Sequence, residues 1–428
     1  MIPFLLLVGL LLLLLSGMPI FAALMLAGSV VLFVFEGSVE SIADTVFWHL
    51  NKPILMTIPL FVFMAQVMIR AGVVDDLFEL ANTVIGHVKG GLGVATVLSC
   101  TIFAAISGSS VATALSIGST AIPQMKKFGY PERNALGVVA AGGTLGILIP
   151  PSGPMILYAV VADASIGALF LAGIVPGILL AVVFALYCMV QARRGAVAES
   201  PPFPGWWKVT RALRQAFWAV AMPPVVMGGI YAGIFTAAEA AAVGSLYALF
   251  VALVIYRGLG LEKLRQCAWE TMHTSTMVLA IIAGAAVFGH AINIIRLPSQ
   301  VSEWIVAMEL GQLGFMLLVM AIVFVMGMFL ESIAIILITT PILLPSMLAL
   351  DVDPIWYGVL LMINLELAMI TPPVGMNLFV IKGITNARLS EVIRGSLPFV
   401  ALMLIGMLAI LAFPPIATWL PLQAGFRF

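Results

Sequence analysis

Charged side chains are scarce in this sequence. They make up only 9% of its 428 residues, and the 19 basic and 19 acidic side chains balance at pH 7. A soluble domain usually carries about 25% charged residues, and a nucleic-acid-binding surface needs a clustered excess of basic ones. The composition therefore excludes an ordinary soluble domain and gives no electrostatic reason to expect nucleic acid as a partner.

Several catalytic and metal-binding signatures are also missing. No lysine is followed by serine or threonine, so there is no P-loop and no sign of ATP hydrolysis. No G-x-S-x-G elbow occurs, and the four histidines form no H-E-x-x-H zinc motif. The three cysteines match no disulfide or metal framework, and we expect buried, inert thiols at Cys100, Cys188 and Cys267.

What the chain has instead is apolar sequence. Hydrophobic residues make up 63% of it, in recurrent runs of about 20 residues, the length of a membrane-spanning helix. The runs do not alternate with polar residues as the strands of a membrane barrel do. The sequence therefore predicts an all-α polytopic membrane protein. The first run lacks a basic leader and a small-residue cleavage site, so we expect it to be retained as a span.

The spans can be placed approximately. Residues 2–35 carry no charge and are long enough for two spans with a turn at 16–19. A polar, amphipathic segment is expected at 36–52 and a surface helix at 75–89. Further spans are expected at about 53–72, 134–162, 167–191, 217–235, 237–256, 271–293, 355–381 and 397–420.

Two of these spans contain a double proline. Pro150–Pro151 and Pro372–Pro373 each remove two backbone donors, so the helix must break there. The two pairs lie 222 residues apart, as do Gly153 and Gly375. A broken helix in hydrocarbon is tolerated where it is buried in protein or lines a cavity. Two matching breaks are typical of the binding site of a secondary transporter, although a pair of structural kinks is the simpler alternative.

Two further apolar stretches are interrupted by small polar residues. Residues 90–125 contain SGSSVAT at 107–113, and residues 311–350 contain GMFLESIA at 327–334. The flanks are short for full crossings, so we expect re-entrant helical hairpins. The chain then divides into a first repeat, a basic cytoplasmic connection and a second repeat, at 1–191, 192–216 and 217–428.

Lysine and arginine predict the orientation. They gather in four connections, at 126–133, 193–214, 257–265 and 382–394. One topology puts all four in the cytoplasm, as the positive-inside rule requires. In that topology the first hairpin enters from the cytoplasm and the second from outside. The two repeats are thus inverted, which is the arrangement that alternating access uses.

The hairpin tips and breaks are rich in oxygen atoms. Hydroxyls and freed carbonyls are hard ligands suited to sodium, and exposed amides at a helix start favour a carboxylate. The candidate binding residues of the first half are Ser107, Gly108, Ser109, Ser110, Thr113, Thr144, Gly146, Pro150, Pro151 and Ser152. Those of the second half are Glu331, Ser332, Thr371, Pro372, Pro373, Gly375 and Asn377.

Structural readings of the same residues remain open. A Ser/Gly-rich patch also serves helix packing in membranes. A carboxylate at mid-membrane depth is costly, so Glu331 is expected to have a bonding partner or a function such as cation binding. The structural alternative is a neutral, hydrogen-bonded carboxyl that holds the hairpin together. Glu366 and Asn364 raise the same question. Glu239 is expected to form a capping box with Thr236.

Taken together, these motifs resemble a known family. Its signatures are similar to SGSSVATALSIGSTAIPQM, GTLGILIPPSGPMILYA, GIFTAAEAAAVG, GMFLES and TPPVGMNLFV, which occur here in the family's order over essentially the whole chain. The family is the large membrane subunit of tripartite ATP-independent periplasmic (TRAP) transporters. It usually shows FTPTEAA where residues 235–241 read FTAAEAA, and we expect the fold to be unaffected.

The resemblance implies a sodium-coupled permease of the bacterial inner membrane that works as an elevator. A separate four-helix membrane subunit would brace it, and a periplasmic binding protein would deliver a small anionic substrate, such as a dicarboxylate, sugar acid or sialic acid. Sodium ions would be the cofactors, one at each junction of hairpin tip and broken helix, with ligands among Ser109, Ser110, Gly146, Glu331, Thr371 and Gly375. The alternatives are an anion transporter without a binding protein and a membrane-embedded enzyme using Glu331 or Glu366.

Overall fold

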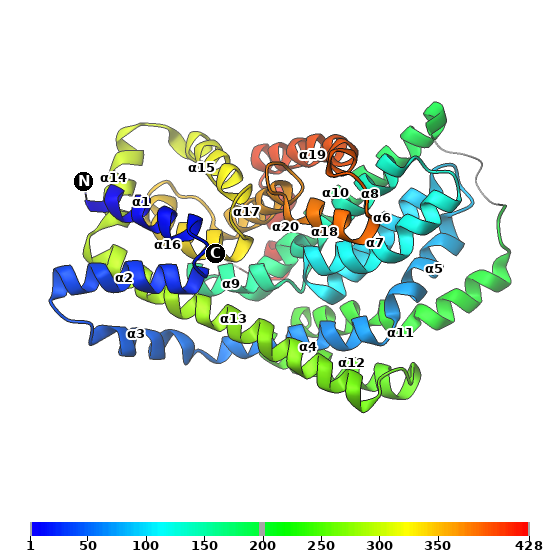
Figure 1. Ribbon diagram of the computed structural model, residues 1–428, viewed down its shortest axis with the longest axis horizontal. Helices are drawn as coiled ribbons and strands as arrows, with labels where there is room; N and C mark the ends of the chain where they lie inside the picture. Colours follow the sequence, from blue (N-terminus) through cyan, green and yellow to red (C-terminus); the bar gives the residue numbers. More distant parts are fainter. Residues whose placement is uncertain (1, 197–201, 427–428) are drawn as a thin grey trace.

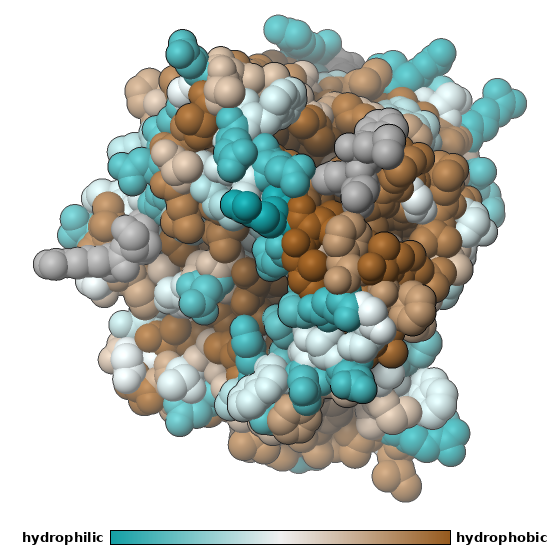
Figure 2. All heavy atoms as spheres, turned by 90° about the vertical axis from the view of Figure 1, so that its left-hand side faces the viewer, coloured by the Kyte–Doolittle hydropathy of each residue, from teal (hydrophilic) through white to brown (hydrophobic). Residues whose placement is uncertain are grey.

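The computed structural model describes residues 2–196 and 202–426, and within these ranges it consists of helices and their connections, with no strand. Seven helical segments of the described chain are long and apolar enough to cross a membrane. Figure 2 shows apolar side chains over much of one face, with polar side chains in patches between them. The prediction of an all-helical, multi-pass membrane protein is therefore confirmed.

The first half of the chain forms eleven helical elements before the connection, and a π-turn, η2 (Ala192–Ala196), follows them. They are α1 (Ile2–Leu15), α2 (Ile20–Glu36), α3 (Ser41–Leu50), the 3₁₀ turn η1 (Pro53–Met56), α4 (Thr57–Arg70), α5 (Val73–Ile85), α6 (Gly91–Ser107), α7 (Ser110–Lys127), α8 (Glu132–Leu148), α9 (Gly153–Ala162) and α10 (Ile166–Gln191).

The second half continues in the same manner from residue 206. Its elements are α11 (Trp206–Tyr231), α12 (Ala237–Phe250), the π-turn η3 (Val251–Ile255), α13 (Leu261–Ile294), α14 (Leu297–Ala307), α15 (Gly311–Gly327), α16 (Ser332–Ala349), α17 (Pro354–Met369), α18 (Met376–Thr385), α19 (Leu389–Ala412) and α20 (Pro415–Gln423).

Several helices of the second half begin and end at positions that match those of the first half. The shift of 222 residues that relates the proline pairs carries the bounds of α7 onto those of α16. It also places the start of α8 on the start of α17, and both helices end just before their proline pair. These bounds support an internal repeat, while the opposite insertion of the two repeats stays a prediction.

Two helices begin earlier than the sequence analysis predicted. α11 starts at Trp206 rather than near 217, and α13 starts at Leu261 rather than near 271. The basic and amphipathic residues before each apolar run contain no glycine or proline, so nothing ends the helix there. A span therefore continues as a helix beyond its apolar part, and hydropathy alone misplaces its start.

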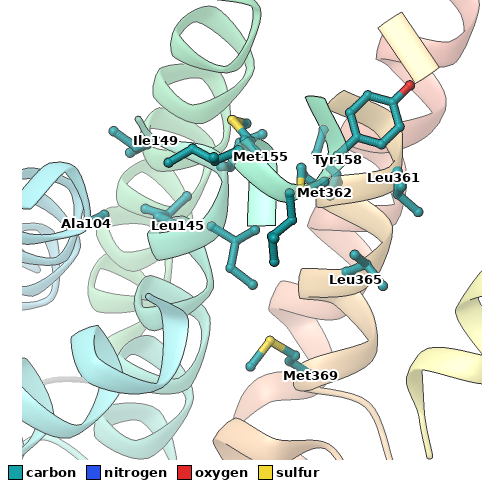
Figure 3. Packing of buried hydrophobic residues seen from close by; sticks show 14 of the residues in the cluster. Ala104, Leu145, Ile149, Met155, Tyr158, Leu361, Met362, Leu365 and Met369 are labelled. Atoms are coloured by element: carbon teal, nitrogen blue, oxygen red, sulfur yellow. The ribbon is translucent and has the colours of Figure 1, made fainter. Parts of the chain in front are cut away.

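The molecule has two parts that meet side by side (Figure 1). In one, which we call the α4–α13 layer, α13 packs along α2, α3 and α4, and α4 packs on α12. In the other, α8 packs against α6, α7 and α19, and α17 packs against α15. Figure 3 shows apolar side chains of α8 and α9 facing those of α17, among them Leu145, Tyr158, Met362 and Met369.

The halves are also interlocked. α18 of the second half packs on α7 of the first hairpin, and α9 of the first half packs on α16 of the second. Each proline-broken helix thus supports the hairpin of the other half.

The second hairpin is more open than the first. α6 and α7 pack along each other, whereas α16 packs chiefly on α14 and α9 and makes little contact with α15. The helix packed behind each hairpin also differs. Gly142 and Gly143 let α8 lie close to Cys100 and Ala114 of the first hairpin, but 222 residues later the positions hold Asn364 and Leu365. These larger side chains keep α17 from the same close fit.

The turn between α11 and α12 carries the expected capping box. The Thr236 hydroxyl accepts the Glu239 N–H at 3.3 Å, and Glu239 Oε2 accepts the Thr236 N–H at 2.8 Å. The departure from the family's FTPTEAA pattern therefore leaves the cap in place. We expect Thr236→Ala to destabilise the protein by about 1 kcal/mol, the usual loss for an N-cap, and to lower the thermal unfolding midpoint in detergent. Glu239→Gln is the control, because glutamine also completes a capping box; an equal loss in both variants would contradict this assignment.

Candidate functional site

The tip of the first hairpin is a two-residue turn between α6 and α7. Gly108 has φ of +59°, a conformation that favours glycine. The Ser109 hydroxyl accepts the Ala112 N–H at 3.3 Å and so caps α7. The Ser107 and Thr113 hydroxyls lie 2.8 Å apart, and Thr113 also donates to the Ser109 carbonyl at 2.8 Å. Hydrogen bonds among the predicted hydroxyl groups therefore stabilise the conformation of the tip.

The tip of the first hairpin lies against the first proline break and the end of α8, and the contacts are between backbone atoms. The Pro150–Pro151 peptide bond is cis, and the break runs from Ile149 to Ser152. A Cβ added to Gly108 would lie 2.5 Å from the Pro151 carbonyl oxygen, and one added to Gly146 would lie 2.5 Å from that of Ser109. Only glycine fits at either contact, so these two positions bring the hairpin tip and the break together.

The second tip sits on α17. Ser332 Oγ lies 3.8 Å from Met369 Sδ, and a Cβ on Gly327 would lie 2.6 Å from the Ala368 side chain. Glu331 occupies the N-cap position of α16. Its carboxyl makes no side-chain hydrogen bond or ion pair within the described ranges, so it is free to take a ligand.

The second break, at Ile370–Gly375, also has a cis proline pair, Pro372–Pro373. The Thr371 hydroxyl donates to the Leu367 carbonyl of its own helix at 2.7 Å. Asn377 instead reaches the other half: its Nδ2 donates to Ser110 Oγ at 2.7 Å. This bond joins the second break to the first hairpin tip.

Both tips and both breaks open onto one cavity of about 280 Å³. The sequence analysis had assigned the two tips separate sites, and the structure brings them to the same space. The predicted residues that line it are Ser107, Gly108, Ser109, Ser110, Pro151, Glu331, Ser332 and Gly375.

The remaining predicted residues lie behind this lining. The Thr144 hydroxyl points away from the first tip, because it donates to the Ala141 carbonyl at 2.6 Å and lies 3.7 Å from Met403 Sδ of α19. Ser152 is fully buried and its hydroxyl has no hydrogen-bond partner in the described chain. The others outside the lining are Thr113, Gly146, Pro150, Thr371, Pro372, Pro373 and Asn377.

The opposite wall of the cavity comes from the α4–α13 layer, which the sequence analysis did not include. Ile58 and Phe61 of α4 and Thr274 and Met277 of α13 line it. The α4 residues carry no sequence signal, since they resemble any apolar span. Thr274 does have one: it lies in the hydroxyl-rich stretch 271–276, at the start of an apolar run.

Glu366 and Asn364, whose roles the sequence left open, are both fully buried in α17. Glu366 Oε1 accepts the N–H groups of Ile147 at 3.1 Å and Leu148 at 2.9 Å, at the end of α8. Asn364 Nδ2 donates to the Met320 carbonyl of α15 at 2.7 Å. Neither side chain lines the cavity.

The polar groups of the cavity are hard oxygen donors. They comprise serine hydroxyls, backbone carbonyls near the Ser109 and Pro151 contacts, and the Glu331 carboxyl. In residues 2–196 and 202–426 no group of three or more His, Cys, Asp or Glu side chains could hold a metal ion. Oxygen ligands without thiolate or imidazole favour alkali or alkaline-earth ions over transition metals.

The chain is similar to known transporter subunits over most of its length. The family model described as tripartite ATP-independent periplasmic transporter, DctM component, matches residues 7–416. A C4-dicarboxylate TRAP transporter large permease protein DctM of Pseudomonas aeruginosa is 38% identical over 403 residues, which is 94% of each chain. The sialic acid TRAP transporter large permease protein SiaM of Vibrio cholerae is 32% identical over 411 residues, which is 96% of each chain.

A solved structure is similar in fold alone. The YdaH transporter of Alcanivorax borkumensis aligns with a TM-score of 0.60 at 14% sequence identity, over 88% of this chain and 89% of that one. The helical architecture is therefore one that a transporter is known to adopt.

Proposed function

Because the chain belongs to the DctM family and is the large permease of a TRAP transporter, we propose that it imports a small carboxylate-type substrate by sodium symport. The cavity between the two hairpin tips carries this proposal, since it gathers hard oxygen donors from both halves of the chain. The chain is a permease rather than an enzyme, as its relatives are.

Sodium is expected at the two tips. Candidate ligands are Ser109, Ser110 and the Gly146 region at the first, and Glu331, Thr371 and Gly375 at the second. Backbone carbonyls freed at discontinuous helices are the usual sodium ligands of such transporters. The close approach of Gly146 to the Ser109 carbonyl supports the first site, and the free Glu331 carboxyl supports the second.

An elevator movement of inverted repeats is part of the proposal. The hairpins and broken helices would move together against the α4–α13 layer, which forms the opposite wall of the cavity. The interlocking of α18 with α7 and of α9 with α16 supports movement as one body. Inverted repeats would then give an outward-facing and an inward-facing state.

The partners follow from the family. A separate four-helix membrane subunit and a periplasmic binding protein would complete the uptake system in the bacterial inner membrane. The relatives are named for C4-dicarboxylates and sialic acid, so we propose a small anionic substrate of that kind for this chain.

The energetics of anion uptake support coupling to a co-transported cation. Moving one negative charge into a negative-inside cell costs about 2.3 kcal/mol per 100 mV. This chain has no P-loop with which to use ATP. Two sodium ions carried with a monoanion would bring net positive charge inward, so the membrane potential would drive uptake. Two sodium ions carried with a dicarboxylate dianion would move no net charge, and the sodium concentration gradient alone would then drive uptake.

The test is uptake into proteoliposomes that contain this chain and its small subunit. With binding protein and substrate outside, we expect an inward sodium gradient to raise initial uptake at least about 10-fold over equal sodium on both sides. Uptake that ignores the gradient would refute sodium coupling. Substantial uptake without binding protein would favour the alternative, an anion transporter that needs none.

A further inference from the structure

Glu366 is a buried acid that the cavity itself does not use. It lies on α17 about one turn before that helix ends at Met369, and its side chain is 0% exposed. Its two hydrogen bonds reach Ile147 and Leu148, which are 219 and 218 residues away in the sequence. Its other oxygen, Oε2, has no hydrogen-bond partner within the described ranges.

Burying this carboxyl is costly in either protonation state. No Lys, Arg or His side chain of the described chain forms an ion pair with it. An apolar side chain of similar size would fill the same space without that cost. An ionisable residue inside a membrane domain usually marks function. Among the described residues, the two N–H groups of α8 are the hydrogen-bond donors that offset its burial.

Those N–H groups lie beside the first hairpin tip. Ile147 lines the cavity, and the preceding residue, Gly146, is in backbone contact with the Ser109 carbonyl. A shift of the last turn of α8 would therefore move the wall against which the tip rests. We propose that Glu366 is a positioning residue that latches the end of α8 to α17 and so sets the geometry of the first cation site; this inference rests on the proposed sodium coupling.

The latch exists in one direction only. The position 222 residues before Glu366 is Thr144, whose hydroxyl bonds its own helix and contacts α19 rather than α17. The first tip thus depends on a side chain of the second half. Within the described residues, Thr144 makes no corresponding hydrogen bond to α17. Loss of the latch should affect sodium binding at the first tip.

The test compares substitutions that keep or remove the acceptor. Glu366→Gln retains an oxygen that can accept both N–H groups, whereas Glu366→Leu fills the space without one. In the assembled complex we expect Glu366→Leu to raise the sodium concentration for half-maximal uptake about 10-fold or more. Glu366→Gln should stay within about 3-fold of the unsubstituted protein. Substrate half-saturation, measured at saturating sodium, should change much less in both.

Asn364→Leu is the matched control. It removes another fully buried polar group from the same helix, but Asn364 bonds α15 and not α8. It should lower the thermal unfolding midpoint and leave the sodium dependence unchanged. Equal shifts of sodium dependence in Asn364→Leu and Glu366→Leu would overturn the proposal in favour of a general packing role.

Two further outcomes keep the test decisive. If Glu366→Leu does not fold, Glu366→Asp retracts the carboxyl by one methylene, and an unchanged sodium dependence in this variant would also overturn the latch. If Glu366→Gln raises the sodium concentration for half-maximal uptake as much as Glu366→Leu does, the ionisable carboxyl and not its role as a hydrogen-bond acceptor is needed. That result would overturn the latch. If the proposed sodium coupling itself is wrong, uptake by the unsubstituted protein will show no sodium dependence. That result differs from a failure of the Glu366 proposal, in which only the effects of the substitutions deviate.

Discussion

Gly146→Val is expected to abolish sodium-dependent uptake, with a loss of about 100-fold or more. The added Cβ would lie 2.5 Å from the Ser109 carbonyl oxygen, far inside van der Waals contact. The Cβ is fixed to the backbone of α8, and the atom that it meets belongs to the backbone of Ser109. A rotamer change therefore cannot relieve the overlap. The hairpin tip must therefore move away from the break, and displacement of about 1 Å at a reacting site can cost 10²-fold.

Initial uptake in proteoliposomes measures this loss, and the sodium-induced rise of the thermal unfolding midpoint reports binding independently of transport. Gly383→Val is the matched control. Gly383 is exposed on α18, and a Cβ there meets no atom within 4 Å. Normal uptake by Gly146→Val would mean that the first tip and the first break do not form one site.

Gly395→Val should have the largest effect on stability, about 3 kcal/mol. A Cβ at Gly395 would overlap the carbonyl of Arg133, and one at Gly137 would overlap the carbonyl of Gly395, so α8 and α19 touch through their backbones. Overpacking of such a contact typically costs about 1–3 kcal/mol. The thermal unfolding midpoint in detergent and the yield of folded protein measure the effect.

Gly228→Val is the control for this second substitution. Gly228 faces outward from α11, with no atom within 4 Å of an added Cβ. The valine there should change stability by less than about 1 kcal/mol, the size of its helix propensity difference from glycine. A Gly395→Val protein as stable as this control would disprove the close approach of α8 and α19.

Local chemistry made much of the fold predictable. Double prolines must break a helix wherever it lies, so the ends of α8 and α17 could be expected from residues 150–151 and 372–373. The turn at Gly108 and Ser109 and the capping box at Thr236 likewise depend on neighbours within a few residues. The interruption at Glu331 and Ser332 gave the boundary of α16 for the same reason.

What escaped prediction depends on pairs far apart in the chain. Nothing near Asn377 indicates that it bonds Ser110, and nothing near Glu366 indicates that it bonds Ile147. The open second hairpin likewise depends on the packing of α16 against α14 and α9, which no residue near its tip indicates. The cavity wall on α4 has no signal at all, since apolar residues face lipid, core and substrate alike.

The interlocked packing of the two halves also constrains how the protein is made. α7 packs on α18, which the ribosome completes only after about 250 further residues. At about 5–20 residues per second, the first hairpin waits roughly 12–50 s for that partner. During this interval Ser110 lacks Asn377 and the end of α8 lacks Glu366. The first half therefore lacks these contacts until α17 and α18 have been made.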